Sequence, residues 1–275
     1  DAGVVDTGAF YALLGDGAIE QDPQLFRSSI DRGGGKIVMT ATERFTRFFG
    51  AWPDQAWGQR EDGMAHRVNE LWAKEDPLRE NEKVLDIAPW EKKRAVAAIR
   101  MASPDIRFTL VGSASGGVIP APGKPTKDQG DCAVRMDPDA PLKLGGLPSG
   151  HMFAIGKECK TGKLIAERWA PGKVRGEVDV IDGVPGAPVA VAAASPDEAY
   201  AIFEDGATAH LATWDGKAWK GEKAPFGAPK SLWGSNDGTA WALGGEGLYQ
   251  HAKGGAWTKV DVGHAKPTSA WAKDA

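Results

Sequence analysis

The sequence contains little sulfur and no long apolar segment. Its 275 residues include only 2 cysteines, and neither Cys-x-x-Cys nor His-x-x-x-His spacing occurs. Because metal ligands are commonly found at such spacings, the sequence predicts no metal site. Its longest apolar runs, such as 95–99 and 189–194, are far shorter than the roughly 20 residues that cross a bilayer. We therefore expect no membrane-spanning segment.

A surplus of one charge and the common cofactor motifs are also missing. The formal net charge is −4 and the isoelectric point is near 5.8. This excludes DNA and RNA as main partners, because nucleic acids bind strongly basic surfaces. No Gly-x-Ser-x-Gly nucleophile turn, phosphate loop or dinucleotide fingerprint is present. The sequence therefore predicts no cofactor.

What the sequence does contain is a repeat. One three-residue pattern recurs six times, at spacings of 46, 51, 45, 47 and 41 residues. It consists of an aromatic residue, then Ala, Gly or Thr, and then usually an aliphatic residue. The aromatic residues of this repeat are Tyr11, Trp57, Phe108, Phe153, Tyr200 and Trp241. Units this small cannot bury their own apolar faces, so they must pack against one another, and the period is typical of propeller blades.

Turn residues divide the units into short strands. The last unit divides into 230–234, 239–244, 247–251 and 256–260, and the second and fifth units divide in the same way. The fourth unit follows this order more loosely, with strands expected at 142–147, 151–156, 164–169 and 176–181. The sequence therefore predicts an all-β protein with one domain over 1–275. That domain is a β-propeller of six four-stranded blades, with seven blades as the alternative.

The two ends of the chain predict a circular closure of this ring. Residues 269–272 resemble the first strand of the last blade, yet no second strand follows them, and residues 1–8 are short of a first strand. Joining the ends continues the repeat with a spacing of 45 residues. We expect the C-terminal strand to complete the first blade and so to remove unpaired sheet edges. A longer native chain cut at this point is the other explanation.

The third unit departs from the pattern. Its strands are expected at 94–101, 106–112 and 117–120, followed by a polar insertion at 122–130 before 132–136. This insertion and residues 31–36 are predicted as long surface loops, which propellers vary in order to bind. Loops without a function are the alternative.

The last unit resembles a known group of proteins. The pattern Leu-Trp-Gly-x-x-Asp-Gly-x-Ala-Trp-Ala-Leu-Gly over 232–244, followed by Gly-Ala-Trp-Thr over 255–258, resembles a blade of bacterial secreted propellers. These are similar to the photosystem II stability and assembly factor and to Asp-box propellers. The resemblance implies an exported protein that holds a protein or a glycan, in the periplasm, anchored to the outer membrane as a lipoprotein, or outside the cell. The Asp-box order itself is not met, so no active site is implied.

The two cysteines bear on the compartment. Cys132 and Cys159 lie 27 residues apart, in segments predicted as loops of neighbouring blades. In an oxidising compartment they could form a disulfide, and two unpaired thiols are the alternative.

The histidines are predicted to be structural. His66, His210 and His251 fall on the third strands of their blades, so they repeat around the ring and cannot converge on one ion. No nucleophile has a base at a recognisable spacing. Tryptophans beside turns are better candidates for binding, because indole faces contact sugars and peptides. The predicted ligand-binding residues are Trp52, Asp54, Trp90, Glu91 and Arg94.

The leading hypothesis is a non-enzymatic binding or assembly module for a protein or glycan. The alternative is a carbohydrate-active enzyme with turn carboxylates at the axial cavity, which needs two carboxylates facing one sugar ring. The enzyme would be favoured by convergence on one pocket of three or more of five residues: Arg94, Arg107, Asp54, Glu91 and Asp105. A spacer fragment of a larger surface protein is a third possibility.

Overall fold

The computed structural model describes strands along most of the chain. Side chains are described for residues 81–88, 90, 94–102, 106–111, 136–147, 149–171, 176–227, 231–234 and 238–261. The statements below on side chains concern these ranges.

The described strands form six four-stranded sheets, each with its strands in chain order and antiparallel. The first sheet contains β1 (Ala2–Val4), β2 (Ala9–Leu14), β3 (Gln24–Asp31) and β4 (Gly34–Ala41). The second contains β5 (Arg47–Phe49), β6 (Trp57–Arg60), β7 (Gly63–Val68) and β8 (Leu71–Lys74). The third contains β9 (Lys83–Glu91), β10 (Arg94–Arg100), β11 (Ile106–Val111) and β12 (Val118–Ile119).

The fourth to sixth sheets continue this pattern. The fourth contains β13 (Lys143–Gly146), β14 (Met152–Lys157), β15 (Leu164–Trp169) and β16 (Glu177–Val180). The fifth contains β17 (Ala187–Ser195), β18 (Glu198–Asp205), β19 (Thr208–Trp214) and β20 (Trp219–Lys223). The sixth contains β21 (Ser231–Gly234), β22 (Ala240–Gly244), β23 (Gly247–His251) and β24 (Trp257–Val260). No helix in the described part of the chain is long and apolar enough to span a membrane.

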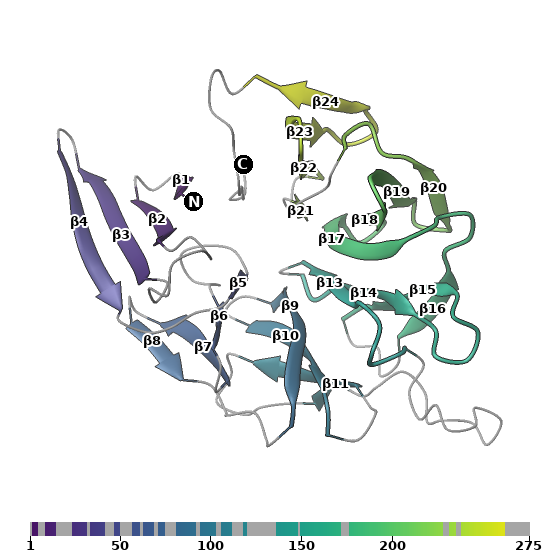
Figure 1. The fold of residues 1–275 in the computed structure, drawn as a ribbon, viewed down its shortest axis with the longest axis horizontal. Coiled ribbons are helices and arrows are strands. Elements are labelled where there is room, and N and C mark those ends of the chain that lie inside the picture. The colour runs from purple at the N-terminus through teal and green to yellow at the C-terminus, as the bar shows by residue number, and fades with distance from the viewer. Residues whose placement is uncertain are drawn as a thin grey trace.

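The sheets follow one another around the molecule (Figure 1), with the first strand of each toward the middle and the fourth toward the outside. The first strands of neighbouring sheets contact one another, as β9 contacts β13, β13 contacts β17, and β17 contacts β21. The fourth and fifth sheets therefore each have a neighbour against either face. Strands buried on both faces have nearly continuous apolar sequences, as in Met152–Lys157 of β14.

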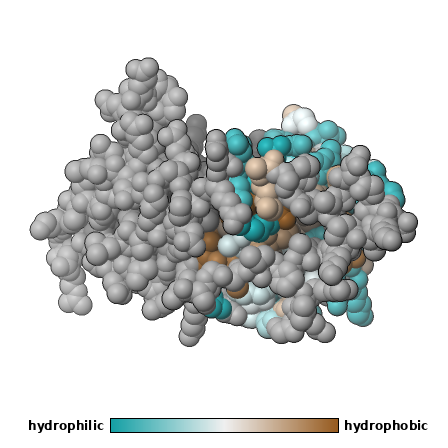
Figure 2. All heavy atoms as spheres, turned by 90° about the horizontal axis from the view of Figure 1, so that it is seen from below, coloured by the Kyte–Doolittle hydropathy of each residue, from teal (hydrophilic) through white to brown (hydrophobic). Residues whose placement is uncertain are grey.

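The core lies at the interfaces between neighbouring sheets. Phe108 and Trp169 join the third and fourth sheets, Phe153 and Trp219 join the fourth and fifth, and Tyr200 packs with the apolar residues of the sixth. The outer strand β20 is instead exposed after its first residue and carries charged side chains. In the view of Figure 2, the described surface is largely hydrophilic and hydrophobic residues show in small areas.

Glycine permits the close approach of the inner strands. A Cβ atom on Gly145 of β13 would lie 2.8 Å from Cγ1 of Val191 on β17. A Cβ atom on Gly234 of β21 would overlap the carbonyl oxygen of Ala193. Any larger residue at these positions would push two inner strands apart.

Strand placement agrees with the sequence prediction in the second, fourth, fifth and sixth units, within a few residues. In the third unit the predicted strands 94–101, 106–112 and 117–120 correspond to β10, β11 and β12. Their order was wrong, because Phe108 lies on the third strand, β11, and not on the second. The second strand, β10, has only alanines and other aliphatic residues between its terminal arginines, so the aromatic signal is missing there. As a result, the prediction also missed the first strand, β9.

The N-terminal predictions have mixed outcomes. Residues 31–36 are not a long loop, because β3 ends at Asp31 and β4 begins at Gly34. The expectation that residues 1–8 lack a first strand was wrong, because residues 2–4 form β1, which pairs with β2 in the position that was left for the C-terminal strand. The C-terminal residues 262–275 and the insertion 122–130 lie outside the described residues, so circular closure stays a prediction.

Candidate functional site

The predicted ligand-binding residues are only partly described. Trp52 and Asp54 lie outside the described residues. Glu91 ends β9 and is the cross-strand partner of Arg94, which begins β10. Trp90 is partly buried and packs against the core between the third and fourth sheets. The chain thus brings Trp90, Glu91 and Arg94 to one hairpin, and their role in binding stays a prediction.

The arginine pocket expected of a carbohydrate-active enzyme is likewise only partly described. Arg107 lies on β11 and forms an ion pair with Glu82 at 3.0 Å. The Glu82 side chain is 2% exposed and the Arg107 side chain 24%, so the carboxylate is shielded from water while the guanidinium is only partly so. Asp54 and Asp105 lie outside the described residues, and the proposed convergence is therefore still a prediction.

The three third-strand histidines do not occupy equivalent positions. His66, His210 and His251 do lie on the third strands β7, β19 and β23. Their cross-strand partners differ, however: Trp57 for His66, Phe203 for His210 and Ala240 for His251. The expectation of a repeated histidine position was wrong, because a common strand does not imply a common register. Within the described ranges, no three His, Cys, Asp or Glu residues are arranged to hold a metal ion.

His251 belongs to a hydrogen-bonded chain between the fifth and sixth sheets. The Tyr200 hydroxyl on β18 donates to Oε1 of Glu198 and lies 2.8 Å from Nδ1 of His251 on β23. The rings of Tyr200, His251 and Trp257 also contact one another, with centroids 5.0–5.5 Å apart. Because the hydroxyl has one proton, donation to Glu198 makes Nδ1 of His251 the donor to Tyr200.

Burial and the Glu198 carboxylate act on the Tyr200 hydroxyl. Desolvation, and then the hydrogen bond to Glu198, raise the pKa of Tyr200 far above its ordinary value. The hydroxyl therefore keeps its proton throughout the physiological range. The sequence marks Tyr200 as a repeat residue but gives no sign of its hydrogen bond to His251, because the two residues are 51 positions apart.

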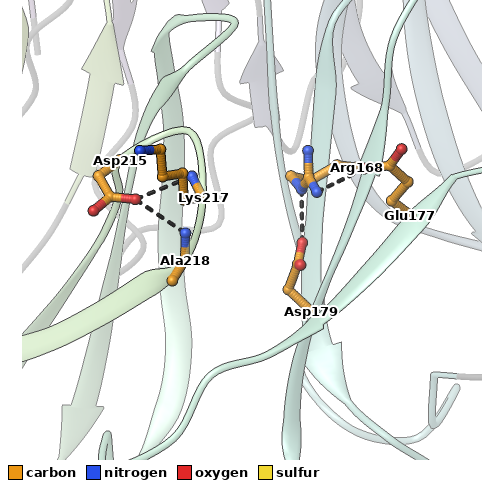
Figure 3. Close-up of polar contacts among 6 residues, drawn as sticks. All are labelled: Arg168, Glu177, Asp179, Asp215, Lys217 and Ala218. Atoms are coloured by element: carbon orange, nitrogen blue, oxygen red, sulfur yellow. Dashed lines mark hydrogen bonds and ion pairs between the residues drawn. The ribbon is translucent and has the colours of Figure 1, made fainter.

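A second polar contact joins the fourth and fifth sheets. Arg168 on β15 donates from Nε to Asp179 at 2.6 Å and from a terminal nitrogen to Glu177 at 2.8 Å. Figure 3 shows both carboxylates on the strand beside the arginine. The guanidinium carbon also lies 4.1 Å from the ring centre of Trp214 on β19. Arg168 thus makes ion pairs within its own sheet and a cation–π contact to the next.

A buried carboxylate joins the third and fourth sheets. Asp86 on β9 is 6% exposed, and its Oδ2 accepts a hydrogen bond of 2.8 Å from the backbone N–H of Leu144 on β13. Because β13 is the innermost strand of its sheet, this N–H is on an edge without a strand partner. The carboxylate therefore satisfies a donor that the sheet itself leaves open.

The turns of the fourth and fifth sheets carry a further group of polar residues. Ser149 precedes β14, and its Oγ lies 3.0 Å from Nδ1 of His151. Desolvation lowers the pKa of His151, while Asp197 in the β17–β18 turn acts in the opposite direction. Ser149 and His151 are only two residues apart and follow no known motif, so this contact does not bear on the expectation that no nucleophile has a base at a recognisable spacing.

The β19–β20 turn is stabilised by Asp215. Its Oδ1 accepts hydrogen bonds of 3.0 Å from the backbone N–H groups of Lys217 and Ala218 (Figure 3). Its Oδ2 lies 2.6 Å from Nζ of Lys220. The hydrogen bond from Lys220, followed by those from Ala218 and Lys217, lowers the pKa of Asp215 to about 2.

Only one of the two cysteines lies within the described residues. Cys159 follows β14 and is partly buried, whereas Cys132 lies outside the described residues. The disulfide therefore stays a prediction.

Comparison with known proteins gives likeness in structure alone. No protein-family model matches the sequence, and no curated protein matches it. The chain is similar to the solved structure of YCF48 from Cyanidioschyzon merolae, with 11% identity, a TM-score of 0.54, and coverage of 93% of this chain and 82% of that one. It is also similar to the β-propeller domain of the Trilobed protease from Pyrococcus furiosus, with 11% identity, a TM-score of 0.56, and coverage of 91% and 79%.

At this level of identity the likeness concerns the fold. Both alignments extend over most of this chain. The domain from the Trilobed protease is described as a β-propeller with an open velcro topology. The described sheets each contain four antiparallel strands, and the third to sixth sheets contact one another in order, which agrees with that architecture. The chain is therefore an all-β protein with a β-propeller fold.

Proposed function

We propose that this chain is a non-enzymatic, exported binding or assembly module that holds a protein or a glycan on one of its loop faces. A rigid framework with variable exposed turns is the usual basis of binding in such folds. The likeness to a structure of YCF48, which resembles the group named from the last repeat, supports the proposal at the level of the fold.

The proposal rests on the contacts that the charged and polar residues of the framework make. Arg168, Asp86 and the group of Glu198, Tyr200 and His251 all bond within or between sheets. These residues stabilise the framework, so they are not free to act on a substrate. The exposed turns are what the framework leaves for a partner.

The test is capture of a partner from a native extract, together with a glycan array. Trp52→Ala is expected to reduce binding at least tenfold, since loss of an aromatic contact at a binding site commonly costs about 1.4 kcal/mol or more. Trp72→Ala is the matched control, because Trp72 lies on the outer strand β8. Binding that is equal in both variants would contradict the assignment of Trp52.

The enzyme hypothesis is tested in the same experiment. A panel of glycosidase substrates is given to the wild-type protein and to the double variant Asp54→Ala, Glu91→Ala. Turnover by the wild type that disappears in the double variant would overturn the binding-module proposal.

Three finer points belong to the same proposal. We propose six blades, with residues 269–272 closing the ring beside β1, which already occupies the edge of the first sheet. Deletion of these residues should then lower the melting temperature. We also propose a Cys132–Cys159 disulfide, consistent with export. The pairing of Met136 with Glu158 supports it, because it brings the chain shortly after Cys132 beside the residue before Cys159. Mass spectrometry of the non-reduced protein would detect the bridge, and two free thiols would contradict it.

A further inference from the structure

One face of the sixth sheet carries two tryptophans. Trp233 on β21 and Trp241 on β22 are cross-strand partners, and their rings are nearly parallel, with centroids 6.5 Å apart and an angle of 4° between the planes. Leu232, which precedes Trp233, packs with residues of the fifth sheet. Because successive residues of a strand point to opposite faces, the two tryptophans lie on the face away from the fifth sheet. We call this the tryptophan face.

The tryptophan face is covered by another part of the chain. Leu243 lies two residues after Trp241 on β22, so it belongs to the same face, and it is 0% exposed. Nε1 of Trp233 is also buried, and it has no hydrogen-bond partner in the described part of the chain. The fifth sheet packs on the opposite face, so it is not what excludes water here.

The repeat gives the direction of this face. Phe153 and Tyr200 hold the position of Trp241 in the fourth and fifth sheets. The Phe153 ring contacts Trp219 of the following sheet, and the Tyr200 ring likewise contacts His251. The tryptophan face is therefore directed toward the sheet that follows the sixth. In Figure 1 the first sheet is the next one around the molecule.

Strand register divides the first sheet into two faces. Tyr11 holds the repeat position in this sheet, so its face is directed toward the second sheet. The other face, which we call the Phe10 face, is predominantly apolar. Cross-strand pairing places on it Val4, Phe10, Ala12, Phe26, Ile37 and Met39. An apolar sheet face of this kind is stable only when it packs against another apolar surface.

The two faces also match in residue size at the inner strands. Between the fourth and fifth sheets a small residue meets a large one, because Gly145 of β13 approaches Val191 of β17 closely. Trp233 holds the register position of Gly145, since each pairs with the aromatic residue of the repeat. Ala2 of β1 holds the position of Val191, since each pairs with the alanine that follows that aromatic residue. The large and the small side are thus exchanged, which keeps the space between the sheets filled.

We propose that the tryptophan face is the docking surface for the Phe10 face, so that the sixth and first sheets close the ring by apolar packing. The inference rests on the six-bladed ring proposed above and adds the surface on which that ring closes. Packing of this kind joins the faces of two sheets and not their edges. It therefore does not depend on residues 269–272.

The test is hydrogen exchange of Phe10→Ala, with Tyr11→Ala as the matched control. Phe10 and Tyr11 are neighbours on β2 and lie on opposite faces by register. Phe10→Ala leaves a cavity under the tryptophan face, so exchange in β21–β24 is expected to become at least tenfold faster. Tyr11→Ala should speed exchange in β5–β8 and leave β21–β24 within twofold of the wild type. Unchanged rates in β21–β24 of Phe10→Ala, or equal acceleration there in both variants, would overturn the proposal.

A reciprocal pair of variants is available if Phe10→Ala does not fold. Trp241→Leu changes the tryptophan face, and Tyr249→Leu changes the opposite face, which packs on the fifth sheet. Trp241→Leu should speed exchange in β1–β4, whereas Tyr249→Leu should act on β17–β20. Exchange in β1–β4 that does not respond to Trp241→Leu would overturn the proposal.

Deletion of residues 269–272 separates packing from closure by a strand. Slow exchange in β21–β24 that persists in the deletion variant would support packing of the two sheets. Fast exchange there in the deletion variant, together with wild-type rates in Phe10→Ala, would assign the cover to the C-terminal residues and overturn the proposal. Failure to capture a protein or glycan would contradict the proposed function and leave these exchange rates unchanged, so the two failures are distinguishable.

Discussion

Tyr200 is a single residue that holds two sheets in register. Its ring is fully buried, while its hydroxyl bonds to Glu198 in its own sheet and to His251 in the next. The apolar part of the residue therefore stabilises the interface through burial, and the hydroxyl fixes how the two sheets are placed.

Removing this hydroxyl should be costly. Tyr200→Phe leaves Glu198 and His251 without a shared partner at a largely buried site, so we expect a loss of about 1–3 kcal/mol in the free energy of unfolding. Urea denaturation measures it. The matched control is Tyr249→Phe, whose hydroxyl acts with Glu246 of the same sheet. An equal loss in both variants would contradict a special role for the contact between sheets.

Asp215 gives a prediction on pH. Its pKa in the folded protein is about 2, below its ordinary value of 3.8. A depressed folded pKa means that the carboxylate stabilises the fold above the ordinary value and that this contribution is lost as the pH falls toward 2. Lys220→Ala should raise the pKa of Asp215 toward 3.8, because the ammonium group is the largest cause of the shift. Carbon NMR of the carboxyl group measures it, and an unchanged midpoint would exclude Lys220 as the cause.

At the scale of strands, the spacing of the inner strands depends on glycine. Gly234→Ala would bring a methyl group onto the Ala193 carbonyl, so we expect a loss of more than about 2 kcal/mol. Gly227→Ala is the control, because no atom lies within 4 Å of the added carbon there. Thermal unfolding of the two variants compares them, and equal melting temperatures would show that β21 can shift at no cost.

The strands themselves were largely predictable. Turn residues and short apolar runs located all four strands of the fourth to sixth sheets, because each sheet begins and ends with local signals. The third sheet was not predictable in the same way. Its second strand contains small aliphatic residues where other sheets have an aromatic one, and the aromatic Phe108 belongs to the next strand, where it contacts Trp169.

The polar contacts between sheets could not be predicted from sequence. Tyr200 and His251, or Asp86 and Leu144, are far apart in the chain and follow no motif. Their pairing depends on which faces of two sheets meet, and a register difference of one residue would reverse it. The three histidines are an example: the sequence correctly predicted that each lies on the third strand of its sheet, but it did not predict which residue of the second strand each one faces.

At the scale of the whole molecule, stability should be shared between neighbouring sheets. Arg168→Met keeps much of the side-chain volume but removes the ion pairs with Glu177 and Asp179 and the contact with Trp214. We expect a loss of about 1–2 kcal/mol. Hydrogen exchange should therefore become faster in β13–β16 and in β17–β20, and the third sheet should change little. Faster exchange in the fourth sheet alone would show that the sheets open independently.

The three interfaces described above each use a different chemistry: a carboxylate with a backbone amide, a guanidinium with an indole, and a phenol with an imidazole. The third to sixth sheets therefore meet through groups that differ from one interface to the next. A sheet duplicated or moved to another position in the order would face a partner without the matching group. The chain has the repetition of a modular array, but exchange of the third to sixth sheets would require redesign of the faces that meet.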